Sequence, residues 1–92
     1  MYKPVLTNKF KKNVELMKRR GLNTDIMQDV MKKLAKGEKL DEKYRDHALK
    51  GDLKGLRECH LTPDWLLVYE IDNNKLYLYL TRTGTHSDLF DE

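Results

Sequence analysis

The sequence predicts an α+β domain in which an N-terminal two-helix hairpin packs on one face of an antiparallel sheet. Two apolar stripes with helical spacing lie between residues 8 and 35, and three strand-like segments follow residue 55. Short turn sequences separate those segments, which favours a sheet of neighbouring strands. The 92 residues correspond to a single domain over 1–92, because folding units usually hold about 50–200 residues.

The first expected elements are a short strand and an amphipathic helix. The sequence "PVLT" at residues 4–7 favours a strand. Across residues 8–20, Phe10 and Met17 belong to an apolar stripe with lysines between its members. Gly21 suits the position after a helix, where glycine adopts a left-handed backbone at little cost.

A second helix is expected to follow almost at once. The sequence "NTD" at residues 23–25 offers an N-cap and an acidic first turn. Ile26, Val30 and Leu34 form its apolar stripe, which ends before Gly37. Because the link is short, we expect an antiparallel helix hairpin packed on the sheet.

The rest of the chain indicates a loop and a three-stranded meander. Residues 38–54 are polar and lack a clean period, so we expect a long loop with at most one helical turn. Strands are expected over 56–62, 65–71 and 75–81. The sequences "TPDW" and "DNNK" between them favour two-residue turns, and Pro63 suits the first.

Composition excludes several classes of protein. Hydrophobic residues make up 39% and charged residues 36% of the chain, which is typical of a globular protein. No apolar run is long enough to span a bilayer, and no signal peptide follows Met1, so we expect a cytoplasmic protein without a membrane partner. The single cysteine, Cys59, excludes an internal disulfide and a cysteine-rich zinc site.

Basic residues concentrate in the N-terminal part of the chain. Residues 1–36 hold ten Lys or Arg against three Asp or Glu, whereas residues 37–92 hold eight against twelve. Such a distribution favours an anionic partner. The alternative is a solvated helix face without a partner.

The meander also brings chemistry-bearing residues to one end of the sheet. His60 and Asp64 lie at the first turn, and the third strand returns Arg82 and His86 to the same end. His47, in the preceding loop, can fold over that end. Histidine exchanges protons near neutral pH and arginine binds phosphate, which favours acid–base chemistry on a phosphate. A divalent metal site and unconnected loop residues remain alternatives.

Two-residue turns would also define the register. They would place His60, Leu67, Leu80 and Arg82 on one face, with Arg82 opposite Trp65. Gly84 would let the backbone turn sharply, so that the residues after it point back at the strand end.

Three sequence motifs resemble the YafQ branch of the RelE/ParE toxin superfamily. The sequences "YRDHALKG", "KGLRECHLTPDWLLVYEI" and "LTRTGTHSDLF" contain, in order, H-x-L-x-G, R-x-x-H-x-x-P-D-W-x-L-x-Y and R-x-G-[ST]-H-x-x-L-F. The motifs lie within residues 44–90, and the expected order of helices and strands extends the resemblance over the chain.

The resemblance implies the toxin of a bacterial type II toxin–antitoxin system with a RelE-like, microbial-ribonuclease-like fold. Such a toxin cleaves messenger RNA in the ribosomal A site without a metal or other cofactor. The implied partners are the ribosome with its message and a cognate DinJ/RelB-like antitoxin, of the ribbon-helix-helix class, in a hetero-oligomer. The alternative is a non-catalytic ParE-like toxin that binds DNA gyrase, although such relatives lack these histidines.

The resemblance also implies roles for individual residues. His86 matches the general acid, His60 and Asp64 match the base side, and Arg82 matches the residue that stabilises charge on the phosphorane. The implied catalytic positions are together His47, His60, Asp64, Arg82, His86 and Phe90. The residues expected to contact RNA are Lys9, Lys11, Lys12, Lys18, Arg19, Lys50, Lys54 and Trp65.

Overall fold

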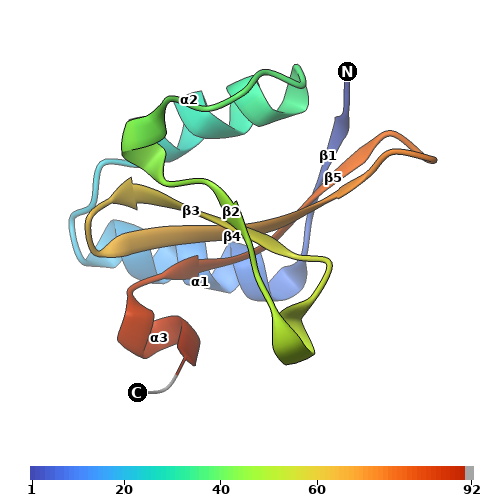
Figure 1. Cartoon of the computed structure of the whole chain (residues 1–92). Helices are drawn as coiled ribbons and strands as arrows, with labels where there is room; N and C mark the ends of the chain where they lie inside the picture. Colours follow the sequence, from blue (N-terminus) through green and yellow to red (C-terminus); the bar gives the residue numbers. More distant parts are fainter. Residues whose placement is uncertain (91–92) are drawn as a thin grey trace.

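The computed structural model describes residues 1–90, which form five strands, three α-helices and two 3₁₀ turns (Figure 1). The elements in chain order are β1 (Lys3–Leu6), α1 (Asn8–Arg19), α2 (Thr24–Ala35), η1 (Glu42–Tyr44), β2 (His47–Ala48), η2 (Gly51–Leu53), β3 (Arg57–Thr62), β4 (Trp65–Asp72), β5 (Tyr77–Gly84) and α3 (His86–Phe90).

The five strands form one mixed sheet in the order β1-β5-β4-β3-β2. The expected antiparallel meander is confirmed, since β3 pairs with β4 and β4 with β5 in antiparallel fashion. The expectation of a wholly antiparallel sheet is wrong for β1, which runs parallel to β5 with Val5 opposite Tyr79. The helix pair forms part of the long connection that such parallel pairing requires.

Local sequence signals account for the two long helices. The Thr7 hydroxyl accepts the Phe10 N–H at the start of α1. At its end the Leu22 N–H donates to the Met17 carbonyl while Gly21 has φ +79°, which is the expected left-handed helix end.

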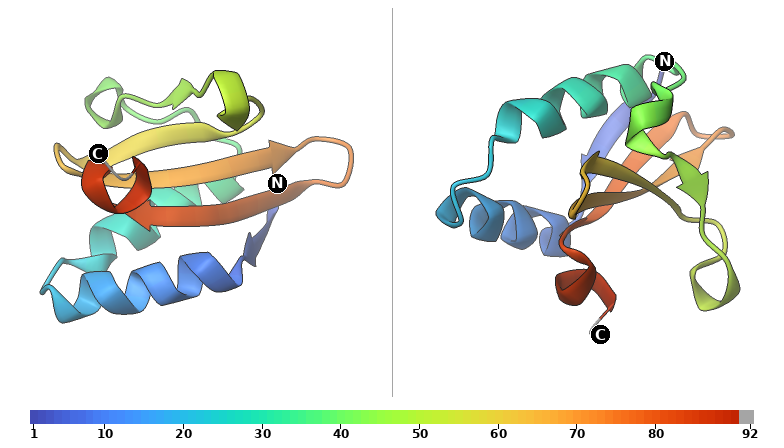
Figure 2. Two further views of the ribbon diagram at one scale, coloured as in Figure 1. Left: turned by 90° about the horizontal axis from the view of Figure 1, so that it is seen from below. Right: turned by 60° about the vertical axis from the view of Figure 1, so that its left-hand side comes forward.

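Both long helices cover the same face of the sheet, as expected (Figure 2). Phe10 of α1 and Val30 of α2 are buried against Leu67, Leu78 and Leu80 of the central strands. This apolar layer leaves the opposite face of β3, β4 and β5 to carry polar groups. Within residues 1–90, no helix is both long and apolar enough to cross a membrane.

Three local expectations were wrong. Residues 38–54 contain two 3₁₀ turns and a short strand, where a loop with at most one helical turn was expected. The β4–β5 connection has four residues, 73–76, because the Asp72 carboxylate accepts the N–H groups of Asn74 and Lys75 and widens the turn. The tail was not expected to be helical, yet it forms α3.

Candidate active site

The three histidines of the chain converge on the face of the sheet that the long helices leave free. Their rings come from β2, β3 and the start of α3. The ring centroids of His47 and His60 lie 6.3 Å apart, and those of His60 and His86 lie 5.8 Å apart. The expectation that His47 folds over this end of the sheet is therefore confirmed.

Glu58 lies between two of these histidines and was not anticipated. Its Oε1 is 3.4 Å from His47 Nε2 and 3.9 Å from His60 Nε2. The residue is 4% exposed, and its buried Oε2 has no hydrogen-bond partner. A buried carboxylate oxygen without a partner is unusual and requires an explanation. The signal in the sequence was its spacing, because residues two apart on a strand share a face.

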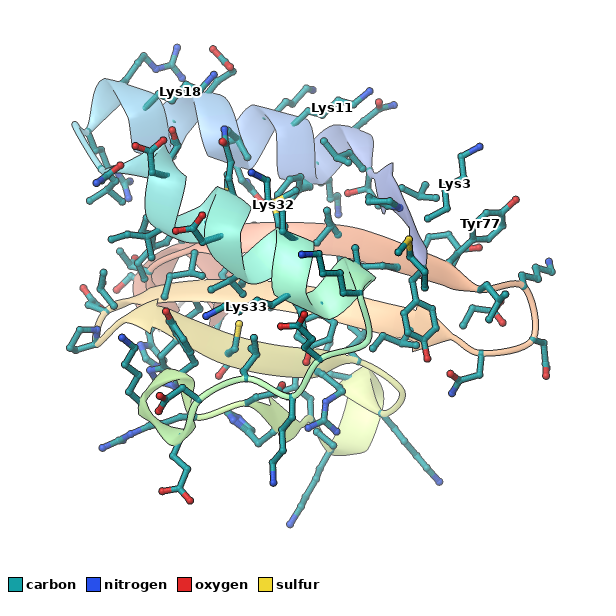
Figure 3. The ribbon with its side chains drawn as sticks, turned by 90° about the horizontal axis from the view of Figure 1, so that it is seen from above. Lys3, Lys11, Lys18, Lys32, Lys33 and Tyr77 are labelled. Atoms are coloured by element: carbon teal, nitrogen blue, oxygen red, sulfur yellow. The ribbon has the colours of Figure 1, made fainter. Side chains whose placement is uncertain are left out.

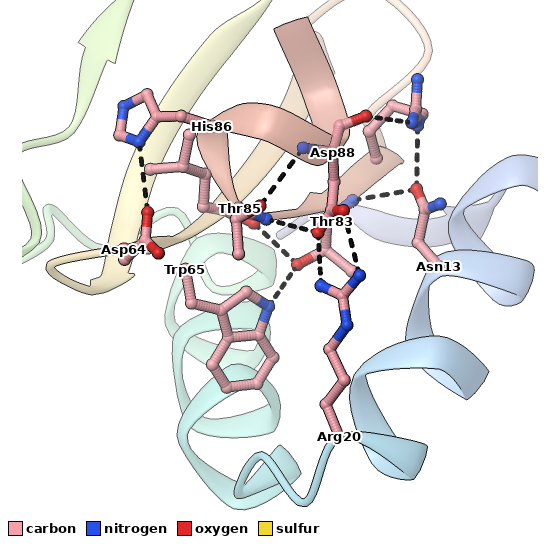
Figure 4. Close-up of polar contacts among 10 residues, drawn as sticks. Asn13, Arg20, Asp64, Trp65, Thr83, Thr85, His86 and Asp88 are labelled. Atoms are coloured by element: carbon pink, nitrogen blue, oxygen red, sulfur yellow. Dashed lines mark hydrogen bonds and ion pairs between the residues drawn. The ribbon is translucent and has the colours of Figure 1, made fainter. Parts of the chain in front are cut away.

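Asp64 approaches the cluster from the β3–β4 turn. Its Oδ1 lies 3.6 Å from His86 Nδ1 (Figure 4). Both side chains are exposed, so each is accessible to a ligand. Phe90 follows one turn later in α3, with its ring centroid 6.3 Å from that of His86.

A reciprocal cap holds the helix that carries His86. The Asp88 N–H donates to the Thr85 hydroxyl at 3.2 Å, and Asp88 Oδ2 accepts the Thr85 N–H at 2.9 Å. Arg20, at the end of α1, donates to both oxygens of the same carboxylate, at 2.6 and 3.1 Å (Figure 4). The hydrogen bond from Arg20, followed by that from the Thr85 backbone, lowers the pKa of Asp88 well below its usual range.

Gly84 allows this arrangement through its size rather than through a turn. Its φ does not lie in the left-handed region. A Cβ at this position would instead lie 2.8 Å from the Cβ of Asp88. The expectation of a sharp bend at Gly84 is therefore corrected, because close approach of α3 to β5 excludes a side chain there.

Arg82 is held by helix α1. Its Nε donates to Asn13 Oδ1 at 2.8 Å, and the same oxygen accepts the Thr83 N–H at 3.2 Å. The expected register was wrong, since Arg82 lies opposite Val68 and not opposite Trp65. The longer β4–β5 loop and an irregularity in the pairing between Val68 and Tyr69 cause this difference.

The register also changes which residues share the face of the site. His60 pairs with Leu66, and Leu66 pairs with Gly84, so these residues lie on the same face as Arg82. Leu67 and Leu80 instead pack in the core beneath the helices, contrary to expectation.

Trp65 belongs to the core and not to the surface. It is 2% exposed, and its Nε1 donates to the Thr83 hydroxyl at 2.8 Å. That hydroxyl in turn donates to the Leu66 carbonyl at 2.7 Å. The structure therefore contradicts a direct RNA contact by Trp65, since its indole is buried and its one donor is used.

A second polar network fixes the segment that carries His47. His47 Nδ1 lies 2.7 Å from the Arg45 carbonyl oxygen, which can only accept, so this nitrogen donates. Asp46, between Arg45 and His47, accepts a 2.5 Å hydrogen bond from the Tyr69 hydroxyl and pairs with Arg57. Burial, followed by the hydrogen bond to Asp46, raises the pKa of Tyr69, so the phenol stays a donor.

Three groups of the site are suitably placed for a metal ion. Glu58, His60 and His86 each offer a ligand atom, and these atoms lie within 4.8 Å of one another. Imidazole and carboxylate ligands suit zinc and copper.

The remaining candidate residues are exposed lysines and arginines. Lys11 and Lys18 of this set lie along α1, whereas the exposed Lys32 and Lys33 of α2 were not among the residues expected to bind RNA (Figure 3). The exposed residues that were expected to bind RNA are Lys9, Lys11, Lys12, Lys18, Arg19, Lys50 and Lys54. Their exposure permits contact with RNA, and that contact stays a prediction.

Residues 2–91 match the family described as "Bacterial toxin of type II toxin-antitoxin system, YafQ". The chain belongs to the YafQ family. It is 36% identical over 85 residues to the mRNA interferase toxin YafQ of Escherichia coli K12, covering 91% of this chain and 90% of the relative.

Two crystal structures of bacterial toxins have closely similar folds. A metal-bound toxin from Helicobacter pylori is 42% identical, with a TM-score of 0.92 over 98% of this chain and 100% of that one. YafQ in the Escherichia coli DinJ–YafQ complex is 32% identical, with a TM-score of 0.90 over 98% and 99% of the two chains. The α+β class and the YafQ resemblance predicted from the sequence are thus confirmed.

Proposed function

We propose that this YafQ-family chain is a toxin that cleaves translated messenger RNA in the ribosomal A site. The observation that carries the proposal is the cluster of His47, His60 and His86 around the buried carboxylate of Glu58. A base, an acid and a cation at one point are what cleavage of a phosphodiester by its own 2′-hydroxyl requires.

The proposed mechanism moves two protons and uses no metal. His60, with Glu58 beside it, takes the proton of the 2′-hydroxyl as the 2′-oxygen attacks the phosphorus. The bond from phosphorus to the 5′-oxygen then breaks, and His86 donates its proton to that leaving oxygen. The products are a 2′,3′-cyclic phosphate, or the 3′-phosphate formed from it by water, and a free 5′-hydroxyl. Each acid or base typically contributes ~10²–10⁴-fold to the rate.

The other site residues orient and stabilise the reacting group. Arg82, held by Asn13, offers its remaining N–H donors to the negative charge that develops on the phosphorane. Asp64 pairs with His86 and holds its ring at the end of the sheet, where the leaving oxygen is proposed to lie. Phe90 lies against the His86 ring and can contact the base that follows the cut.

Binding partners follow from the relatives. The Escherichia coli relative is named an mRNA interferase toxin, and a crystal structure shows Escherichia coli YafQ in a complex with DinJ. We accordingly propose a DinJ-like antitoxin for this chain, in a toxin–antitoxin hetero-oligomer. The exposed basic residues of α1 and around η2 would attach the toxin to ribosomal RNA without sequence preference.

Cleavage of a ribosome-bound message, mapped by primer extension, tests this proposal. We expect His60→Ala and His86→Ala to abolish cuts in translated messages while retaining the fold and antitoxin binding. Lys36→Ala, an exposed position outside the site, is the matched control and should cleave like the parent. Equal cleavage by the histidine variants and the parent would overturn the assignment.

A metal-dependent nuclease is the second candidate, favoured by the Glu58, His60 and His86 group and by the metal-bound Helicobacter pylori relative. Cleavage that survives EDTA excludes it. Added zinc should then inhibit cleavage, because a metal on these two histidines blocks proton transfer. A ParE-like toxin would instead damage DNA and leave messages intact, which the same primer extension separates.

A further inference from the structure

A cavity of about 630 Å³ opens beside the histidine cluster, between α2, η1 and the end of β3. Its lining includes Ile26 of α2, Tyr44 of η1 and Arg45 directly after it. His60 of β3 and Pro63 of the following turn line it as well. Strand β2 pairs with β3 only at Arg57 and Glu58, so it leaves this later stretch of β3 uncovered. The volume falls within the roughly 300–1,000 Å³ range of small-ligand sites.

The cavity adjoins the histidine cluster at His60. His60 lines the cavity and also lies 5.8 Å, between ring centroids, from His86. Arg45 lines the cavity while its carbonyl accepts the hydrogen bond that orients His47. A ligand in the cavity therefore touches the same short segment that sets the position of a histidine of the site.

The backbone at Arg45 is unusual for its residue type. Its φ is +48° in the left-handed region, which non-glycine residues rarely adopt. Such conformations cluster where they place a side chain for function. Here the left-handed turn places Arg45 in the lining of the cavity and directs its carbonyl towards His47.

The lining of the cavity suits a nucleotide. Tyr44 is half-buried, and Ile26 and Pro63 add apolar surface against which a base can pack. Positive charge surrounds the tyrosine ring, with Lys43 Nζ 5.2 Å and Lys33 Nζ 5.9 Å from its centroid. Aromatic rings stack on bases of any sequence, and exposed basic side chains bind the phosphate backbone.

We propose that this cavity binds the nucleotide on the 5′ side of the scissile phosphate. The proposal rests on the proposed function, in which His60 acts on the 2′-hydroxyl and His86 acts on the leaving 5′-oxygen. The 2′-hydroxyl belongs to the nucleotide 5′ of the cut, and the leaving oxygen belongs to the next one. Because the cavity adjoins His60, it takes the first of the two, with Tyr44 and Arg45 against its base and ribose and the scissile phosphate at the histidines.

Nucleoside 3′-monophosphates probe the cavity without cleavage. Each carries a base, a ribose and a 3′-phosphate in the positions proposed for the 5′ nucleotide. We would titrate the ¹⁵N-labelled protein with 3′-AMP, 3′-GMP, 3′-CMP and 3′-UMP, and in parallel with inorganic phosphate. The nucleotides should shift the amide resonances of residues 43–45 and His60, whereas phosphate should leave residues 43–45 in place.

Two variants separate the cavity from the phosphate site. Tyr44→Leu retains an apolar side chain, and Arg45→Asn removes the charge with a residue that tolerates a left-handed backbone. We expect each to weaken nucleotide binding about fivefold or more, with inorganic phosphate binding within about twofold of the parent. Lys32→Gln, an exposed position on α2 outside the lining, is the control and should bind nucleotides like the parent.

The outcomes distinguish the cavity from the proposed function. The cavity assignment would be overturned if nucleotides and phosphate shifted the same amide resonances. It would also be overturned if Tyr44→Leu bound nucleotides as tightly as the parent protein, even where messages are cleaved. Absence of message cleavage by the parent protein, measured by primer extension, would overturn the proposed function and this subsite with it. Shifts at residues 43–45 together with weakened binding in both variants, in a protein that cleaves messages, would support it.

Discussion

Replacing Asp88 with alanine should slow cleavage without unfolding the protein. The substitution removes the carboxylate that accepts the Thr85 N–H at 2.9 Å and the two hydrogen bonds from Arg20. Helix α3 has five residues and none of them is fully buried, so little packing compensates. The start of α3, where His86 lies, should therefore lose its fixed position.

The size of the effect follows from the cap. Loss of a capping side chain typically costs about 1 kcal/mol, which is about a fivefold change in an equilibrium constant. The contribution of Arg20 adds to this. We therefore expect the single-turnover cleavage rate of Asp88→Ala to fall at least about fivefold. A global loss of that free energy would lower the melting temperature by ~4–8 °C, and a local loss in α3 should lower it less.

Controls separate the cap from the ion pair. Asp88→Glu places the residue most typical of a capping box at the same position and should recover part of the rate. Arg20→Gln removes the ion pair and leaves the cap, so its loss should be smaller. Glu15→Ala, whose carboxylate pairs only with exposed Lys18 on the surface of α1, is the matched control. Cleavage by Asp88→Ala at the rate of the parent protein would refute the reasoning. A rate loss accompanied by the full fall in melting temperature expected for global destabilisation would also refute it.

The pH dependence of the hydrogen bonds that Asp88 accepts from Arg20 and Thr85 follows from the direction in which the pKa of Asp88 is shifted. Because the hydrogen bonds lower the pKa of Asp88, its contribution is complete above the ordinary carboxyl value of 3.8 and is lost as pH falls towards the lower, folded-state value. The stabilisation from these hydrogen bonds is therefore constant between pH 5 and 8. Any change of cleavage rate in that window should persist in Asp88→Glu, which can be checked by comparing the two pH profiles.

Three further outcomes are expected. Trp65→Phe should lower the free energy of unfolding in urea by about 1 kcal/mol, through loss of the bond to Thr83, and leave RNA affinity within twofold. Cys59 should resist a thiol reagent in the native protein at pH 8 and react after unfolding, because burial raises its pKa to about 12; rapid native labelling would contradict this. Lys11→Gln with Lys12→Gln should reduce the salt dependence of ribosome binding, and an unchanged salt slope would remove α1 from the interface.

Elements with local signals could be predicted from the sequence. The helix ends at Gly21 and Gly37 both have positive φ, as glycine in that position favours. The Pro63 turn is a two-residue hairpin, with Thr62 opposite Trp65. In each case a few neighbouring residues determine the backbone, so no knowledge of distant contacts was required.

Features that depend on long-range pairing could not be predicted. The parallel position of β1 depends on hydrogen bonds to a strand more than seventy residues away in the sequence. The hydrogen bond from Arg82 to Asn13 joins a strand and a helix that have no common motif. Glu58 carried a weak signal, its spacing from His60, but only the fold shows that His47 lies beside the same carboxylate.

The pairing of β1 with β5 has a consequence for how the protein is made. The first strand of the chain has its neighbour in the sheet only after residues 77–84 are present, and Arg82 and His86 lie in or just beyond that stretch. During synthesis, the helices and the first strand leave the ribosome long before the strand that completes the sheet. The face that carries the histidine cluster is therefore complete only after residues 77–86 have been synthesised. A truncated translation product that stops before residue 77 would therefore lack both the strand that pairs with β1 and the residues Arg82 and His86.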